Sequence, residues 1–348
     1  MIKIGAHSVG QGCSPFIIAE MSGNHNQSLD RAFELVDAAA SAGVHALKLQ
    51  TYTAETITLD LNNSEFVVSD KNILWAGQNL AELYRKAHTP WEWHSPIMER
   101  ARQNGLVVFS SPFDETAVDF LETLNVPAYK IASFEIVHLP LIKKAASTGK
   151  PLIMSTGLAS VSEIAEAVST AREAGCKELV LLKCTSTYPA SPENTNLLTI
   201  THMRNLFQCE IGISDHTMGV GASVAAVALG ATVIEKHFTL SRADGGVDST
   251  FSLEPAELKA LVEETHRAHL AIGSISYGPT PAEEKSLIFR RSIYCSNDIN
   301  EGELFTSKNI KIIRPGLGLK PKHYDSVMNK RAKCNLKKGT PLKWSDIS

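Results

Sequence analysis

Short apolar runs alternate with amphipathic stretches along most of the chain. Between the runs, apolar residues recur at helical spacing, and glycine closes three of these stretches at Gly43, Gly175 and Gly230, as it commonly does at helix ends. The runs predict strands at 16–20, 45–50, 106–111, 128–133, 151–156, 178–184, 209–214 and 231–238. The intervening pattern predicts helices that include 29–43, 114–124, 160–175, 219–230 and 255–273.

This alternation predicts an α/β fold, a (β/α)8 TIM barrel, because eight strand–helix repeats suffice to close a parallel barrel. A doubly wound open sheet is the alternative. Residues 1–14 are interpreted as a flap or hairpin over the barrel bottom. Residues 51–89 are too long for a plain strand-to-helix connection, so we expect a lid or binding loop there.

The pattern changes after the eighth repeat. Residues 276–289 are polar and contain prolines, which is typical of a linker. Residues 290–348 carry short β-prone runs broken by turn residues, so we expect a small, mostly β domain. The predicted organisation is a barrel over 1–275, a linker over 276–289 and the small domain over 290–348. So short a domain is expected to pack on another part of the protein.

Charge is unevenly divided between these parts. The net charge of -3 gives no reason to expect nucleic acid or a membrane as a partner. Residues 290–348, however, hold 13 Lys/Arg against 5 Asp/Glu, which leaves 21 against 32 for residues 1–289. The six cysteines form no C-x-x-C pair, and no signal peptide or membrane-spanning run is evident, so a cytoplasmic location is expected.

Polar side chains follow every predicted strand. In a TIM barrel the carboxyl ends of all eight strands meet at one face, where the site is built. We therefore expect one site there. The polar residues at the ends of the runs are Glu20, Lys48, Gln50, Ser110, Ser111, Lys130, Ser133, Glu135, Ser155, Thr156, Lys183, Thr185, Ser186, Ser214, Asp215, His216, Lys236 and His237.

Three lysines in this set, Lys48, Lys130 and Lys236, predict a socket for a small polyanion. Lysine ammonium groups and serine hydroxyls both donate hydrogen bonds to phosphate or carboxylate oxygens. Any one of these lysines could instead be an ordinary surface residue. The candidate hydroxyls are those of Ser111, Ser133, Ser155, Ser186 and Ser214.

His216 and His237 end adjacent predicted strands, so their imidazoles can share a divalent cation. The other interpretation is a pair of buried histidines satisfied by hydrogen bonds. If a metal is bound with oxygen ligands around it, Mn2+ or Mg2+ is favoured over zinc. Glu20 and Glu135 are candidates for acid–base chemistry or for binding sugar hydroxyls, and Asp248 is a further candidate.

Several of these motifs resemble the sialic acid synthase family in order and spacing. The motifs are "FIIAEMSGNHNQSLDRA" (16–32), "ALKLQTY" (46–52), "SSPFDETAVDFL" (110–121), "PAYKIASFEI" (127–136), "LIMSTGLAS" (152–160), "LLKCTSTYPA" (181–190), "GISDHTMG" (212–219) and "VIEKHFTLSRADGGVDSTFSLEP" (233–255). Residues 290–321 resemble the family's antifreeze-like (SAF) domain. The stretches "AEMSGNHNQSL" and "GGVDSTFSLEP" are most similar to the branch that makes pseudaminic acid.

The resemblance implies a metal-dependent condensation of phosphoenolpyruvate with an amino-sugar aldehyde, giving a nine-carbon acid and phosphate. For the pseudaminic branch the sugar is 2,4-diacetamido-2,4,6-trideoxy-L-altrose. N-acetylmannosamine, which gives N-acetylneuraminate, and the precursor of legionaminic acid are the alternative sugars.

The resemblance also implies roles for individual residues. His216 and His237 would hold Mn2+ or Mg2+, and the small domain would cap the barrel of the other subunit in a domain-swapped homodimer. Lys48, Lys130, Ser111, Ser133, Ser155, Ser186 and Ser214 would surround phosphoenolpyruvate, whereas Glu20, Gln50, Glu135, Tyr188, Asp248 and the partner's Arg314 would face the sugar. Ser186 departs from the asparagine of the sialic acid enzymes, which leaves its contact in question.

Two other functions remain open from the residues alone. A barrel metallohydrolase or sugar isomerase would act without phosphoenolpyruvate and would need more protein ligands to its metal. A non-enzymatic protein that binds carbohydrate or ice would leave the lysines and the histidine pair without a role.

Overall fold

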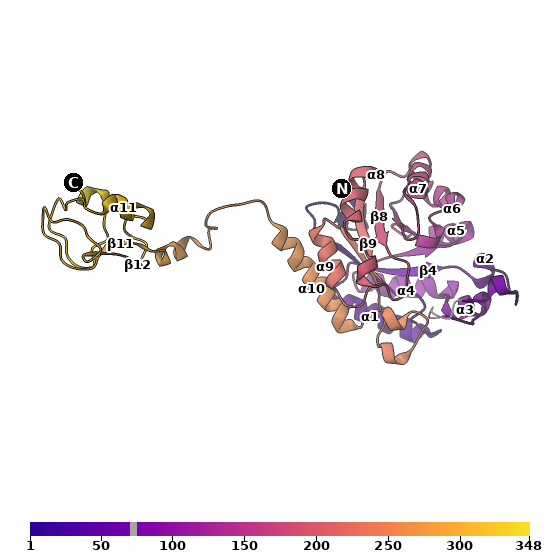
Figure 1. Ribbon diagram of the computed structural model, residues 1–348. Coiled ribbons are helices and arrows are strands. Elements are labelled where there is room, and N and C mark those ends of the chain that lie inside the picture. Colours follow the sequence, from indigo (N-terminus) through magenta and orange to yellow (C-terminus); the bar gives the residue numbers. More distant parts are fainter. Residues whose placement is uncertain (70–74) are drawn as a thin grey trace. The chain divides into compact units, whose positions relative to one another are not determined.

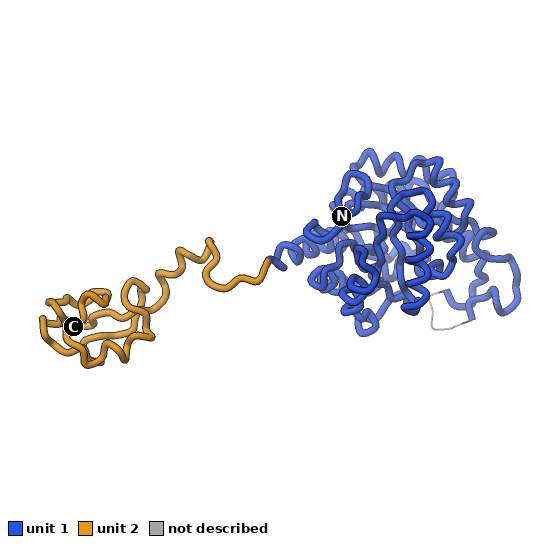
Figure 2. The backbone as a smooth tube through the Cα atoms, turned by 90° about the horizontal axis from the view of Figure 1, so that it is seen from above, with its two compact units in different colours: residues 1–273 blue, residues 274–348 orange. Residues whose placement is uncertain are grey.

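The computed structural model describes residues 1–69 and 75–348 and divides into two compact units, residues 1–273 and 274–348 (Figure 2). Each unit has its own cluster of buried apolar side chains. The break between the units lies close to the predicted start of the linker.

The first unit is a closed barrel of eight parallel strands surrounded by helices (Figure 1). This confirms the predicted TIM barrel and rules out an open sheet, since β10 pairs with both β9 and β3. The barrel strands are β3 (Phe16–Glu20), β4 (Ala46–Thr51), β5 (Val107–Pro112), β6 (Tyr129–Ile131), β7 (Leu152–Ser155), β8 (Leu179–Cys184), β9 (Glu210–Ser214) and β10 (Val233–His237).

Amphipathic helices follow the strands in chain order. Each buries one apolar stripe, as α1 does with Leu35, Val36 and Ala39. Ser28 caps α1 at its start and Gly43 ends it in the left-handed conformation. The helices are α1 (Leu29–Ala42), α4 (Trp91–Gln103), α5 (Glu115–Thr123), α6 (Leu139–Ala146), α7 (Val161–Glu173), α8 (Thr199–Phe207), α9 (Gly221–Ala228) and α10 (Pro255–Ile272).

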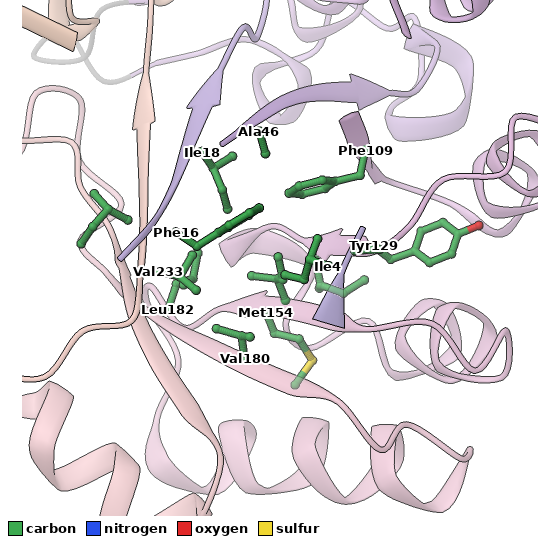
Figure 3. Packing of buried hydrophobic residues seen from close by; sticks show 14 of the residues in the cluster. Ile4, Phe16, Ile18, Ala46, Phe109, Tyr129, Met154, Val180, Leu182 and Val233 are labelled. Atoms are coloured by element: carbon green, nitrogen blue, oxygen red, sulfur yellow. The ribbon is translucent and has the colours of Figure 1, made fainter. Parts of the chain in front are cut away.

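Apolar side chains fill the barrel towards the amino ends of its strands. Phe16, Ile18 and Phe109 lie near one another in the core, whereas Tyr129 points away from them (Figure 3). The hairpin of β1 (Ile2–Ile4) and β2 (His7–Val9) contributes the fully buried Ile4. The backbone NH of Lys3 donates to Glu178, the residue before β8, so the hairpin lies at the amino ends of the strands as expected.

The segment between β4 and α4 carries short elements of its own, α2 (Ala54–Ile57) and α3 (Leu80–Ala87). Asn79 caps α3, and its side-chain amide also donates to the carbonyl of Leu61. These bonds fold the described part of the insertion back on itself. Residues 70–74 of this predicted lid lie outside the described residues.

The second unit is small and contains the antiparallel pair β11 (Ser292–Cys295) and β12 (Ile310–Ile313). Isolated bridges add to this pair, and α11 (Tyr324–Val327) is a single turn. A 3-10 helix over Glu284–Phe289 occupies part of the predicted linker. The core of the second unit contains the buried side chains of Ile293, Phe305, Val327 and Leu342. The unit is the mostly β domain that the sequence predicts.

No helix in the described ranges is long and apolar enough to cross a bilayer.

Candidate active site

The carboxyl ends of the barrel strands surround a cavity of about 480 Å3. This volume is within the usual range for small-molecule sites, about 300–1,000 Å3. Seven of the eight strands or the residues directly after them contribute lining side chains, which include Lys48, Gln50, Lys130, Ser133, Ser155, Cys184, Ser214, His216, Glu235 and His237. The predicted convergence of strand ends is therefore present.

Lys48 and Glu20 form a buried ion pair at the base of this cavity. They are opposite each other on β4 and β3, and Nζ of Lys48 lies 2.5 Å from Oε2 of Glu20. Lys48 also donates to Oγ of Ser111, at 3.2 Å. Glu20 and Ser111 thus lie behind Lys48 rather than on the cavity wall. Burial raises the pKa of Glu20 to about 7, against the opposing effect of Lys48.

Glu235 lies between the two lysines, and sequence reasoning did not include it in the site. Its Oε1 is 3.4 Å from Nζ of Lys130 and 4.0 Å from Nζ of Lys48, and it accepts a hydrogen bond from Ser214. The carboxylate is buried, but the lysines outweigh this burial and hold its pKa below the ordinary value. The two ammonium groups therefore share a carboxylate counter-charge within the barrel.

Lys236 was expected in the same anion socket, and that expectation was wrong. Its Nζ lies 2.9 Å from Oδ2 of Asp215 and donates to the carbonyl of Thr217, and it does not line the cavity. Neighbouring side chains on a strand point to opposite faces, so with Glu235 and His237 directed into the barrel Lys236 must point outward. The same alternation could have placed Glu235 in the cavity, since it is two positions before His237 on β10.

His216 and His237 face each other across the ends of β9 and β10, with ring centroids 5.3 Å apart. Nδ1 of His216 lies 3.0 Å from the carbonyl of Thr185 and 3.9 Å from Sγ of Cys184. A hydrogen bond to that carbonyl uses the Nδ1 proton and leaves Nε2 as the free lone pair. Burial lowers the pKa of His216, but Cys184 outweighs it and the net shift is upward.

The residues present fit a divalent cation. Nδ1 of His237 is buried and has no hydrogen-bond partner among the residues that the structure describes. Burial together with His216 keeps the pKa of this histidine well below the usual value, so the ring is neutral. Oδ2 of Asp248 lies 3.8 Å from this nitrogen. In the described part of the chain no group of three His, Cys, Asp or Glu side chains is placed to hold a metal ion by itself. Two histidines suit a cation whose other ligands are oxygens of water or substrate.

A chain of hydrogen bonds links Glu20 to Asp248. Nε2 of Gln50 donates to Oε1 of Glu20 and contacts Oγ of Ser22 at 3.2 Å, and Ser22 in turn donates to the Asp248 carboxylate. Ser22 has a φ of 48°, the left-handed region that a serine rarely adopts. The loop after β3 thereby fixes the Gln50 amide and the Asp248 carboxylate on one side of the cavity.

The remaining predicted hydroxyls lie on the opposite side. Oγ of Ser133 accepts from the backbone NH of Gly157 at 3.2 Å, and Oγ of Ser155 is buried with no hydrogen-bond partner in the described ranges. A side chain at Gly157 would collide with Ser133 and with Ser186, whose hydroxyl lies 3.7 Å from Sγ of Cys184. Ser186 contacts lining residues but does not itself line the cavity.

Glu135 and Tyr188 are at the mouth of the cavity. Burial raises the pKa of Glu135 to about 7, with its own backbone NH and Lys130 opposing the rise. The ring of Tyr188 packs 4.5 Å from that of His216 and 5.7 Å from that of Trp75, centroid to centroid. Arg314 belongs to the second unit, where its side chain is exposed, so it is not one of the residues that the barrel brings together.

Two protein-family models match this chain. The NeuB family matches residues 35–277, and the SAF domain matches residues 290–348. The chain is 44% identical over 334 residues to the pseudaminic acid synthase of Helicobacter pylori, covering 96% of this chain and 98% of that protein. It is 37% identical over 329 residues to the N,N'-diacetyllegionaminic acid synthase of Campylobacter jejuni, covering 92% and 96%.

Solved structures of similar proteins share the fold of this chain. The N-acetylneuraminic acid synthetase of Leptospira borgpetersenii, in complex with citrate, superposes with a TM-score of 0.73 at 33% identity, covering 82% of this chain and 94% of that one. The spore coat polysaccharide biosynthesis protein SpsE of Bacillus subtilis superposes with a TM-score of 0.68 at 34% identity, covering 100% and 99%.

Proposed function

The chain belongs to the NeuB family, and on that premise we propose that it condenses phosphoenolpyruvate with 2,4-diacetamido-2,4,6-trideoxy-L-altrose to give pseudaminic acid and phosphate. The identity to pseudaminic acid synthases, 44%, exceeds the 37% and 36% found with diacetyllegionaminic acid synthases. The legionaminic acid precursor and N-acetylmannosamine are the alternative sugars.

One observation carries the proposal. Two buried lysines, Lys48 and Lys130, and two facing imidazoles, His216 and His237, line the same cavity at the carboxyl end of the barrel. Such a cavity can bind a small polyanion beside a cation. A hydrolase or isomerase of neutral sugars would have no use for two buried ammonium groups, which are costly to desolvate.

In the proposed complex, phosphoenolpyruvate lies against Lys48 and Lys130. Its phosphate and carboxylate oxygens accept hydrogen bonds from these lysines and from Ser133, Ser155 and Ser214, which line the cavity, whereas Ser111 supports Lys48 and Ser186 lies beside Cys184. Oγ of Ser155 has no hydrogen-bond partner among residues 1–69 and 75–348, so it can donate to the ligand. Before the anion binds, the Glu235 carboxylate balances the lysine charges. Binding is therefore mainly a matter of positioning the anion.

His216 and His237 would hold Mn2+ or Mg2+. When bound, the cation would polarise the sugar aldehyde as a Lewis acid and orient it. The chain also prepares both rings to bind the cation. The Thr185 carbonyl fixes the proton of His216 on Nδ1, which leaves Nε2 for the metal, and burial keeps His237 neutral.

Carbon 3 of phosphoenolpyruvate attacks the aldehyde carbon, and carbon 2 gains cationic character. The buried carboxylate of Glu235, on the cavity wall, lies where it can stabilise that charge, and Glu20 acts through its ion pair with Lys48. Water then adds at carbon 2, and phosphate leaves as the carbon–oxygen bond breaks. Because the pKa of Glu135 is raised to about 7 and this residue lines the cavity, its carboxyl can accept the proton of the water near neutral pH.

On the sugar side, Gln50, Tyr188 and Asp248 are proposed to contact hydroxyl and acetamido groups. The partner subunit's Arg314 would complete this wall in a domain-swapped homodimer. Opposite charge supports that arrangement, because residues 290–348 carry 13 Lys/Arg against 5 Asp/Glu while residues 1–289 carry 21 against 32. The six free cysteines support a reducing, cytoplasmic location.

Product analysis tests the proposal directly. The purified protein is incubated with phosphoenolpyruvate, Mn2+ and each of the altro-configured and manno-configured acetamido sugars, and the products are identified by mass spectrometry. We expect a nine-carbon acid from the altro-configured diacetamido sugar at a rate well above that from N-acetylmannosamine. Preference for another sugar would correct the substrate, and no product from any sugar would refute the function.

A further inference from the structure

The lining of the cavity is mostly polar where the strand ends contribute and mostly apolar where the insertion between β4 and α4 contributes, and we call these parts the inner end and the outer chamber. The inner end carries Lys48, Lys130 and Glu235. The outer chamber is lined by Ile57, Val68, Leu80, Leu83 and Val247, of which the first four come from the insertion between β4 and α4. The insertion therefore contributes a hydrocarbon wall to the site, whereas the strand ends contribute its charges.

These side chains are not part of the barrel core. The cluster of buried apolar residues that fills the first unit, as described for residues 1–69 and 75–348, does not include Ile57, Val68, Leu80 or Leu83. Leu83 is nevertheless only 7% exposed. Leu83 is withdrawn from water without packing on the core, and Ile57, Val68 and Leu80 are half-buried. All four line the cavity, so stabilising the barrel does not account for them.

Aromatic rings hold the chamber in shape. The ring of Tyr52 lies 5.7 Å from that of Tyr84 on α3 and 5.0 Å from that of Phe113, both edge-on. On the other side, Nε1 of Trp75 donates to the carbonyl of Val247 at 2.9 Å, which ties the insertion to the loop after β10. The apolar wall is thus fixed at both ends before any ligand enters.

We propose that this chamber is a methyl-binding subsite that selects a sugar with a deoxygenated carbon 6. The inference rests on the proposed function. Carbon 1 of the sugar must meet phosphoenolpyruvate at the polar end, so carbon 6, at the opposite end of the six-carbon chain, faces the apolar side chains. A methyl group there is transferred from water to hydrocarbon, and a hydroxymethyl group would bury a hydroxyl against Leu83 and Val68.

The size of this selection can be estimated from general pocket energetics. One methylene or hydroxyl in an apolar pocket changes kcat/KM by about 10- to 200-fold. The protein should therefore prefer the 6-deoxy sugar to its 6-hydroxy counterpart by a factor in this range. The inner end does not contact carbon 6, so the KM for phosphoenolpyruvate should be the same with both sugars.

The first experiment uses the unmodified protein and two sugars that differ by one oxygen atom. Phosphate release from phosphoenolpyruvate is measured with 2,4-diacetamido-2,4,6-trideoxy-L-altrose and with 2,4-diacetamido-2,4-dideoxy-L-altrose. We expect kcat/KM to be at least about tenfold higher for the 6-deoxy sugar. Equal values would overturn the methyl subsite and leave the proposed function intact. No release with either sugar, or with the other acetamido sugars, would refute the proposed function itself.

Variants then locate the selection in the chamber. Val68→Thr and Leu83→Asn replace apolar groups by polar ones of similar size, so each should lower the 6-deoxy preference about tenfold, mainly through slower use of the 6-deoxy sugar. Leu59→Asn is the matched control, since Leu59 is on the same insertion, is 60% exposed and does not line the cavity. It should keep the wild-type ratio.

The ratio of the two sugars separates selection from general damage. A partly misfolded variant loses activity on both sugars in proportion and keeps their ratio. If both chamber variants fold, as judged by an unchanged KM for phosphoenolpyruvate, and still keep the wild-type ratio, the subsite is refuted. If Leu83→Asn does not fold, the result with Val68→Thr decides.

Discussion

The imidazole rings of His216 and His237 lie 5.3 Å apart, centroid to centroid, although β9 and β10 are separated by the whole of α9. Parallel pairing of Ile234 with Ile213 sets these strands in register, so both histidines emerge at the same end of the barrel. The close approach of two imidazoles beside a buried lysine pair is the geometric basis of the proposed chemistry.

His237→Ala should reduce turnover by at least about a hundredfold, because loss of a metal ligand costs at least as much as loss of its supporting hydrogen bonds. The fold should persist, since Nδ1 of the ring has no hydrogen-bond partner in the described part of the chain. Steady-state kinetics and thermal unfolding measure the two effects. His202→Ala on the exposed face of α8 is the control and should match wild type. A near-normal rate in His237→Ala would refute the metal role.

Glu235→Gln should destabilise the protein by about 3 kcal/mol, since it leaves two buried ammonium groups without their shared carboxylate. Urea unfolding measures this change in the free energy of unfolding. The exposed Glu166→Gln on α7 should stay within about 0.5 kcal/mol of wild type. A Glu235→Gln variant as stable as the control would show that the buried cluster is not ionised as described.

Glu135 should make stability depend on pH. Its pKa rises from 4.5 in the unfolded chain to about 7 in the folded protein, so the native state binds the proton more tightly. That contribution to stability is fully present below pH 4.5 and is lost as the pH rises to 7. Glu135→Gln cannot ionise, so between pH 5 and pH 8 its stability relative to wild type should rise by about 2–3 kcal/mol. Urea unfolding at several pH values measures the difference, and parallel curves would contradict the buried, neutral carboxyl.

Arg314→Ala should impair use of the sugar with little change in the KM for phosphoenolpyruvate, since the proposed contact is with the sugar alone. Deletion of residues 290–348 should have the same effect in stronger form. Arg291→Ala, an exposed arginine in the same unit, is the control. A fully active barrel without the second unit would rule out the capping role.

Mixing two inactive variants tests the domain swap. If Arg314 acts in the partner's barrel, co-refolded or co-expressed Arg314→Ala and His237→Ala chains form mixed dimers in which one of the two sites is intact. Random pairing should then restore roughly a quarter of wild-type activity. If each chain used its own Arg314, no mixed site would be complete and no activity would return.

The barrel could be predicted from the sequence because its two kinds of element leave different patterns. Buried parallel strands carry continuous apolar runs such as 179–182, whereas helices such as 161–173 repeat at helical spacing. The positions of the strand ends then follow from the fold, which is why the sequence alone assigns Lys48, Lys130, His216 and His237 to one face of the barrel.

The rest of the site depends on relations that the sequence does not display. Ser22 and Asp248 are 226 positions apart, and their contact requires the left-handed backbone of Ser22. The apolar chamber depends on which side of α3 faces the cavity. The orientation of a short helix within a long insertion cannot be predicted from its sequence alone. The prediction for Lys236 was wrong for a simpler reason, since it took no account of the alternation of side chains along β10.

Phosphate release from phosphoenolpyruvate tests the central claim most directly, because it reports on the anion, the cation and the sugar at once. The purified protein is assayed with and without the diacetamido sugar, and with and without a chelator followed by Mn2+. We predict release only when sugar and cation are both present, with recovery when Mn2+ is restored. Release that is indifferent to the chelator and to the sugar would contradict the account.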